Sequence, residues 1–152
     1  MNSAIWWLAG AVAVATVVAL VSAVRWWYAV ITVHGPSMAP TLVDGDRVLA
    51  RRCHLRALRT GALVIFLEPG FGSPKGRPAW LTGAANSLWV VKRVAAVPGD
   101  PVPDAVLQAV NGAAVVPRRA IVVLGEIPES RDSRQWGFIP ASHVLGKAVR
   151  RL

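Results

Sequence analysis

The chain has 152 residues, of which 54% are hydrophobic and 16% are charged. Lysine and arginine number 17 against 8 acidic residues, a formal net charge of +9, and a single cysteine excludes an intrachain disulfide framework. A basic surplus favours an anionic partner, either nucleic acid or a lipid surface. Because no helix-turn-helix, zinc-finger or aromatic RNA-binding pattern is present, the sequence favours a membrane surface over nucleic acid.

The first predicted element is a membrane-spanning helix. Residues 4–24 are almost entirely apolar and carry no charge, and a helix of that length reaches about 30 Å, the thickness of a bilayer core. Aromatic residues stand at both ends, at 6–7 and 26–28, as in the aromatic belts of spanning helices. A cleaved signal peptide is the competing interpretation, but the apolar stretch is longer than usual and no basic side chain precedes it. We therefore expect a retained transmembrane helix at residues 4–25, after a short tail at residues 1–3.

The remaining residues, 26–152, are expected to form one all-β domain. Segments rich in Val, Ile and Leu alternate with segments containing Gly, Pro, Asp and Asn, as is typical of short strands separated by turns. The predicted strands are residues 28–33, 46–52, 61–67, 88–97, 106–110, 120–124 and 143–149. Asn111 and Gly112 lie between two of these segments and predict a β-hairpin.

A long loop is expected at residues 69–87, which are rich in Gly, Pro and Ser. Trp80 and Leu81 within it, and Trp89 after it, are candidates for insertion into the membrane interface, because amphipathic rings favour that zone.

Two segments carry side chains suited to peptide-bond chemistry. Ser37 follows Pro36 and precedes Pro40, and the two prolines restrict the backbone around its hydroxyl. Lys92 lies inside an apolar predicted strand, where burial would lower its pKa and make the neutral amine available as a base. Taken singly, neither residue is specific, since serines often bond the backbone in turns and lysines often extend from edge strands into water.

Four segments, in order, resemble the sequence boxes of bacterial type I signal peptidases. Residues 35–46 resemble the box of the nucleophilic serine, and residues 60–66 resemble the strand that follows it. Residues 91–100 resemble the lysine box, and residues 125–137 resemble the last box. The match covers residues 33–148, and it implies a signal-peptidase-like β domain behind one N-terminal transmembrane helix.

The resemblance implies a role for several individual residues. Ser37 would attack the scissile carbonyl, and Lys92 would be its general base. Ser130 would orient the lysine amine, while Asp132 and Arg134 would form a supporting ion pair. Four residues would bind the substrate: Val33, Leu42 and Val91 would line shallow pockets for small side chains, and Met38 would flank the nucleophile.

The sequence also departs from the family pattern. Gly35 stands where many relatives have a serine that donates to the oxyanion, Ala96 replaces a glycine, and Glu126 with Ile127 replaces an Asp-Asn pair. These departures leave two alternatives open beside general signal peptide removal. One is a specialised processing peptidase of a pilus, conjugation or secreted-peptide system, and the other is a catalytically degenerate membrane-bound binding protein.

The implied partners are exported proteins that bear signal peptides, together with the lipid bilayer. We expect no cofactor, no nucleic acid and no metal, because no His or Cys pair has the spacing of metal ligands. The implied location is the plasma membrane, single-pass, with the catalytic domain on the extracytoplasmic side. Counting positive charges alone would favour the opposite orientation, since Arg25 and the basic residues 51–59 follow the helix; long domains, however, translocate largely regardless of charge.

Overall fold

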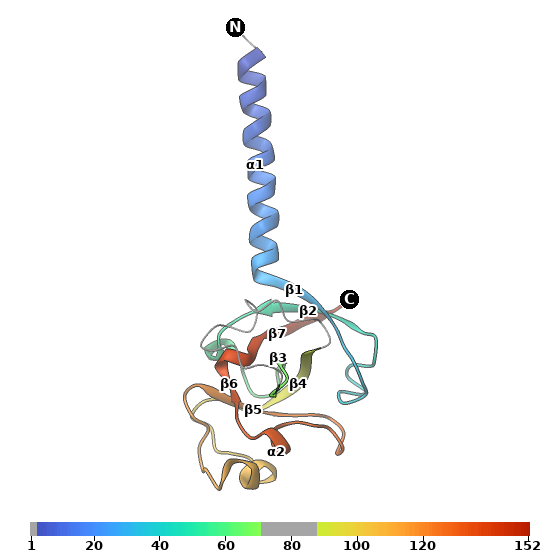
Figure 1. Cartoon of the computed structure of the whole chain (residues 1–152), viewed down its shortest axis with the longest axis vertical. Coiled ribbons are helices and arrows are strands. Elements are labelled where there is room, and N and C mark those ends of the chain that lie inside the picture. The colour runs from blue at the N-terminus through green and yellow to red at the C-terminus, as the bar shows by residue number, and fades with distance from the viewer. Residues whose placement is uncertain (1–2, 71–87) are drawn as a thin grey trace.

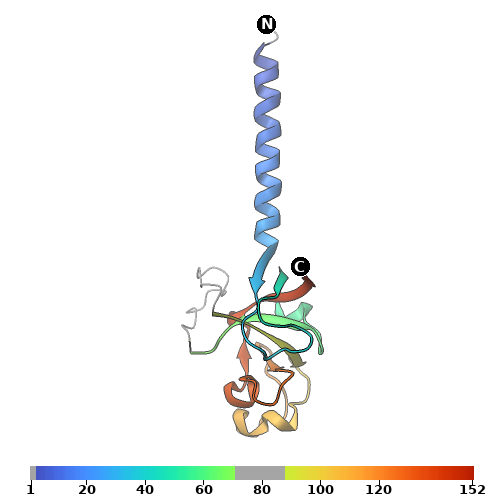
Figure 2. The ribbon, with the colours of Figure 1, turned by 90° about the vertical axis from the view of Figure 1, so that its right-hand side faces the viewer.

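The N-terminal element is one long apolar helix that stands clear of the rest of the molecule. The structure is a computed structural model, and it describes residues 3–70 and 88–152. Helix α1 covers Ser3–Trp27, and its stretch Trp6–Trp27, with a mean hydropathy of 2.3, is long and apolar enough to cross a membrane. It projects away from a β domain (Figures 1 and 2), and its side chains from Trp6 onward are exposed.

Seven strands form one antiparallel sheet, as expected for an all-β domain. The strands are β1 (Tyr28–Thr32), β2 (Arg47–Arg52), β3 (Leu63–Leu67), β4 (Trp89–Ala96), β5 (Ala120–Leu124), β6 (Ile139–Pro140) and β7 (Val144–Arg151). Their order across the sheet is β1-β2-β7-β3-β4-β5-β6. The short helices are α2 (Ser133–Trp136) and the 3-10 turns η1 (Leu55–Ala57), η4 (Asp104–Val110) and η5 (Ala141–His143).

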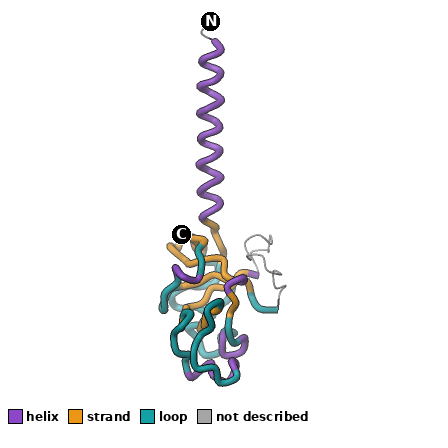
Figure 3. Tube along the Cα trace, turned by 90° about the vertical axis from the view of Figure 1, so that its left-hand side faces the viewer, coloured by secondary structure: helices purple, strands orange, loops and turns teal. Residues whose placement is uncertain are grey.

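The sheet is curled, so that its central strands are buried on both faces. Register shifts interrupt three of the strand pairs, β2–β7, β3–β7 and β4–β5, and such bulges bend strands and increase their twist. Along β3, Ile65 and Leu67 join one apolar cluster while Val64 and Phe66 join another, as the alternation of side chains along a strand requires. Strands β1, β2 and β7 lie next to α1, and loops and short helices lie mostly at the far end (Figures 1 and 3).

The predicted strand at residues 106–110 is wrong, and so is the hairpin at Asn111 and Gly112. These residues form the end of η4, whose buried Val106 and Val110 pack in a third cluster with Val122. Asn111 ends this helix in the left-handed conformation, with φ 53°. An Asn-Gly pair supplies positive φ at a helix end as readily as in a hairpin, so the pair alone did not distinguish the two structures.

The expected interfacial role of Trp89 is also wrong. Its side chain is only 8% exposed and packs in the cluster that includes Ile65 and Val91. The predicted loop at residues 69–87 falls almost entirely, with Trp80 and Leu81, outside the residues that the structure describes.

Candidate active site

Lys92 is a buried lysine in the middle of the sheet. It lies on β4 opposite Val64 of β3, its exposed fraction is 2%, and its Nζ donates to Ser130 Oγ over 2.6 Å. Because burial removes the ammonium from water, the pKa of Lys92 falls to about 8. A minor fraction of the amine is therefore neutral near pH 7, far more than for a lysine of ordinary pKa, and this amine is in contact with a serine hydroxyl.

Asp132 and Arg134 form an ion pair behind Ser130. The Asp132 carboxylate is fully buried and accepts from the Gly125 and Arg134 backbone N–H groups and, at 3.0 and 2.7 Å, from the Arg134 guanidinium. It also caps α2, with Gln135 completing a capping box. Burial acts to raise the pKa of Asp132, but these hydrogen bonds outweigh it and lower that pKa. Asp132 is therefore ionised, and it fixes the segment that carries Ser130.

Ser37 lies in the turns that follow β1, and its side chain is half-buried. Its carbonyl oxygen accepts from the Glu126 N–H over 3.0 Å. A Cβ added at Gly125 would meet Ser130 Oγ at 1.9 Å and the Ser37 carbonyl oxygen at 3.0 Å. Gly125 thus separates the Ser37 backbone from the Ser130 hydroxyl, and Ser130 in turn contacts Lys92. The Ser37 backbone and the Lys92–Ser130 pair therefore lie on either side of a glycine that has no side chain to keep them apart.

Three further residues connect the segments of the site, and sequence reasoning had not identified them as site residues. Thr41 Oγ1 donates to Glu126 Oε1 over 2.8 Å, and Arg93 pairs with the same carboxylate. Arg93 also donates to the Gly61 carbonyl over 2.8 Å. Glu126 thereby holds the Ser37 segment against the strand that carries Lys92. Because 85 residues separate Thr41 from Glu126, no local sequence pattern could have indicated this link.

The four residues predicted to bind the substrate lie in one apolar cluster. Their exposed fractions are 5% for Val33, 1% for Met38, 3% for Leu42 and 5% for Val91. The cluster lies beneath the turns that contain Ser37, so these side chains support that segment. Contact with a substrate remains a prediction.

Gly35 occupies a backbone conformation that explains the departure at this position. Its φ is +83°, a region that L side chains rarely adopt. Its N–H donates to the Asp44 side chain over 2.7 Å, which closes the loop that contains Ser37. Glycine is therefore favoured here by the backbone, independently of any role in oxyanion binding.

Within residues 3–70 and 88–152, no three His, Cys, Asp or Glu side chains form a group that could hold a metal ion. The arrangement that these residues do form is a buried amine of lowered pKa, a serine hydroxyl bonded to it, and a second serine segment beside them. Such a group can take and return one proton at a hydroxyl.

Comparison with known proteins identifies the family of the chain. The family model for signal peptidase, peptidase S26, matches residues 5–105 and 102–152. The chain is 32% identical over 125 residues to a mitochondrial ATP-independent inner membrane protease subunit 1a of Arabidopsis thaliana, covering 79% of this chain and 67% of that protein. It is 29% identical to a probable signal peptidase I-1 of Synechocystis, covering 76% and 66%, and 27% identical to signal peptidase I of Leptolyngbya laminosa, covering 76% and 64%. The matched region thus spans about two thirds of these relatives. The chain belongs to the signal peptidase family, peptidase S26.

Proposed function

We propose that this protein is a membrane-bound serine endopeptidase that removes signal peptides from exported proteins, with Ser37 as nucleophile and Lys92 as general base. The observation that carries the proposal is the buried Lys92 amine, 2% exposed, whose pKa is lowered to about 8 and which contacts Ser130. At its ordinary pKa of 10.5 the lysine would be almost entirely protonated near neutral pH, whereas a pKa of about 8 makes the neutral amine far more accessible as a base.

The proposed reaction has two halves. The Ser37 hydroxyl attacks the scissile carbonyl carbon while the neutral Lys92 amine takes its proton. The carbon–nitrogen bond then breaks, the lysine ammonium gives that proton to the departing amine, and an ester to Ser37 remains. Water attacks this ester with Lys92 again accepting a proton, the acid product leaves, and the proton returns to Ser37. The balance of the reaction is one water consumed for one peptide bond cleaved.

Ser130, Asp132 and Arg134 are proposed to orient the amine. Ser130 accepts a hydrogen bond from the Lys92 Nζ and so restricts its orientation, and the Asp132–Arg134 pair holds the Ser130 segment in place. Val33, Met38, Leu42 and Val91 are proposed to shape shallow pockets that accept only small side chains before the cut.

The anchor and its orientation belong to the same proposal. Helix α1 would hold the β domain at the bilayer surface, where a membrane-held precursor presents its cleavage site, and confinement raises the effective concentration of the two. We propose that the β domain lies on the extracytoplasmic side of the plasma membrane. Protease added outside cells with an intact plasma membrane should then digest it, whereas protection would place it in the cytoplasm.

The decisive experiment is cleavage of exported precursors by the purified full chain in detergent. The native chain should cut after a small residue, as read by mass spectrometry of the product, and Ser37→Ala and Lys92→Ala should not cut. Ser142→Ala is the matched control, because this serine lies away from Lys92 and should leave cleavage unchanged. Cleavage by Lys92→Ala would overturn the mechanism, and inactivity of the native chain on many precursors would favour a binding protein.

A specialised processing peptidase is the second candidate. The relative from Arabidopsis, named an inner membrane protease subunit, matches the chain at 32% identity, beside the two signal peptidases at 29% and 27%. A panel of unrelated precursors separates the two functions, because a general enzyme should cut most of them and a specialised one very few.

A further inference from the structure

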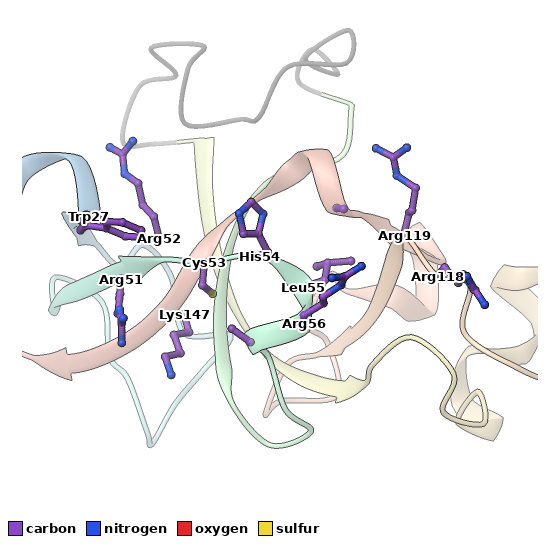
Figure 4. Close-up of a pocket in the computed structure, with 12 residues that line it drawn as sticks. Trp27, Arg51, Arg52, Cys53, His54, Leu55, Arg56, Arg118, Arg119 and Lys147 are labelled. Carbon is purple, nitrogen blue, oxygen red and sulfur yellow. The ribbon is translucent and has the colours of Figure 1, made fainter. Parts of the chain in front are cut away.

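A large cavity lies at the base of α1, and none of the residues proposed for catalysis is among the described residues that line it. Its volume is about 730 Å³, within the range of sites that take small molecules. Figure 4 shows the residues around it, with Trp27 beside Arg52, and Arg52 and Arg119 pointing to the same side. The lining residues come from the end of α1, from β2 with the following η1, from the turn before β5, from η5 and from β7. They are Trp27, Arg51 to Ala57, Arg118, Arg119, Ala141 and Lys147.

The lining is strongly and uniformly basic. Among the described residues, five arginines and one lysine line the cavity, and no Asp or Glu does. The ion pairs of the described residues are made by other arginines, at positions 93, 131, 134 and 151. Within the part of the chain that the structure describes, Arg56, Arg118 and Arg119 therefore have no carboxylate partner. Like charges gathered in this way repel one another unless an anion binds between them.

The place of the cavity indicates where that anion comes from. Trp27 is the last residue of α1 and of the stretch that could span a membrane, and tryptophan favours the headgroup level of a bilayer. Leu55, Ala57 and Ala141 add apolar surface to the lining. A cavity that is cationic, partly apolar and adjacent to the end of a spanning helix matches a phospholipid, which has an anionic head and an apolar body.

We propose that this cavity binds the phosphate-bearing headgroup of an anionic phospholipid from the surrounding bilayer. Arginine is suited to this ligand, because its planar guanidinium can donate two parallel hydrogen bonds to one phosphate. Occupancy would neutralise the basic cluster and fix the orientation of the β domain at the membrane surface. The proposal rests on the membrane anchoring by α1 but not on the catalytic mechanism.

Native mass spectrometry of the full chain in uncharged detergent tests the site. The protein is equilibrated with equal amounts of phosphatidylglycerol, phosphatidylethanolamine and phosphatidylcholine. The native chain should retain phosphatidylglycerol preferentially. Arg56→Gln with Arg119→Gln should reduce its retention at least about fivefold, since one basic residue near anionic lipid contributes roughly that factor. The matched control is Arg47→Gln with Arg150→Gln, which removes two exposed arginines of β2 and β7 outside the cavity and should retain the lipid like the native chain.

Each other outcome overturns the proposal. Equal retention of phosphatidylcholine would mean that the headgroup charge is not recognised, and an equal loss in the control variant would mean diffuse attraction without a site. Release of the lipid by an excess of inorganic phosphate would mean that the cavity binds a free anion and not a lipid headgroup. Ser37→Ala should bind lipid normally, and the Arg56, Arg119 variant should still cut a soluble peptide in uncharged detergent, so failure of the lipid site and failure of the peptidase can be told apart.

Discussion

Lys92 shows how burial can outweigh the neighbouring charges in setting the pKa of a single residue. Burial lowers the pKa of Lys92, Asp132 acts to raise it, and Arg134 acts to lower it again. Glu68 also acts to raise it, so the neighbouring charges act in opposite directions, and burial is the largest of these effects. Desolvation therefore prevails, and the pKa of Lys92 settles at about 8.

The rate of peptide cleavage should follow this titration. Only the neutral amine can accept a proton, so kcat/KM should rise with pH and level off above an apparent pKa of about 8. Lys92→Arg should be inactive at every pH, because the guanidinium does not deprotonate in this range. The pH profile of the native chain checks the expectation, and a rate already level at pH values well below this pKa would contradict it.

The stability of the fold should carry the same signature without any substrate. Lys92 has a lower pKa folded than its ordinary 10.5, so between about 8 and 10.5 the unfolded chain binds more protons and stability rises with pH. Below about pH 8, burial of the charged lysine lowers the free energy of unfolding by an amount on the order of 3 kcal/mol. Lys92→Met should remove this pH dependence and be at least as stable at neutral pH. Urea unfolding at several pH values measures the stability of both proteins and its dependence on pH. If the stability of the variant rises with pH as steeply as that of the native chain, the lowered pKa does not belong to Lys92.

Gly125 should tolerate no side chain. An alanine Cβ there would lie 1.9 Å from Ser130 Oγ, so the serine hydroxyl must move away from Lys92. Gly125→Ala should therefore lose about as much activity as Ser130→Ala, while the fold persists. Comparing kcat/KM and far-ultraviolet circular dichroism of the two variants checks this, and full activity in Gly125→Ala would show that the Ser130 contact is dispensable.

At the scale of elements, the segment between β5 and α2 organises the site. It supplies Gly125, Glu126, Ser130 and Asp132, which together contact the Ser37 segment, β4 and the first turn of α2. Burial acts to raise the pKa of Glu126, but hydrogen bonds from Arg93 and Thr41 outweigh it and lower that pKa. Glu126 therefore carries its charge, and it joins two segments that are distant in sequence.

Replacing Glu126 by glutamine should loosen this junction. The variant keeps the size of the side chain but loses the charge that binds Arg93, and kcat should fall roughly tenfold or more, as misplacement of a reacting group commonly causes. Glu129→Gln, an exposed neighbour in the same segment, should retain native kcat. The apparent pKa in the rate profile should stay near that of the native chain, since the Lys92 environment is unchanged. Equal activity of both variants would contradict a positioning role for Glu126.

At the scale of the whole molecule, α1 meets the β domain at its C-terminal end, where Trp27 lines the basic cavity, and contributes no side chain to the buried core. The helix side chains from Trp6 to Trp27 are exposed, and none belongs to the three buried clusters of the domain. A fragment of residues 26–152 should therefore fold, with a Tm within a few degrees of the full chain in detergent. It should still cut soluble peptides but should cut membrane-held precursors more slowly, because it is no longer confined with them. An unfolded fragment, seen by circular dichroism, would show that α1 is part of the domain.

The sequence alone determined the elements that depend on local patterns. The apolar stretch predicted α1 to within two residues of its end at Trp27, and six of the seven predicted strands are present. The sequence patterns did not reveal β6, which has only two residues. They also predicted a strand where η4 lies, because a short apolar run does not distinguish a strand from a tight helix that buries one face. The resemblance to signal peptidases, carried by short segments in order, was sufficient to identify the family.

Only the tertiary structure decided how distant segments meet. The contact of Lys92 with Ser130 joins residues 38 apart, and that of Thr41 with Glu126 joins residues 85 apart. The basic cavity likewise combines side chains from residues 51–57, 118–119 and 147. Burial, which sets the pKa of Lys92, exists only once β3, β4 and β5 are paired. These properties arise from packing between segments, and a pattern of residue types along one chain does not contain them.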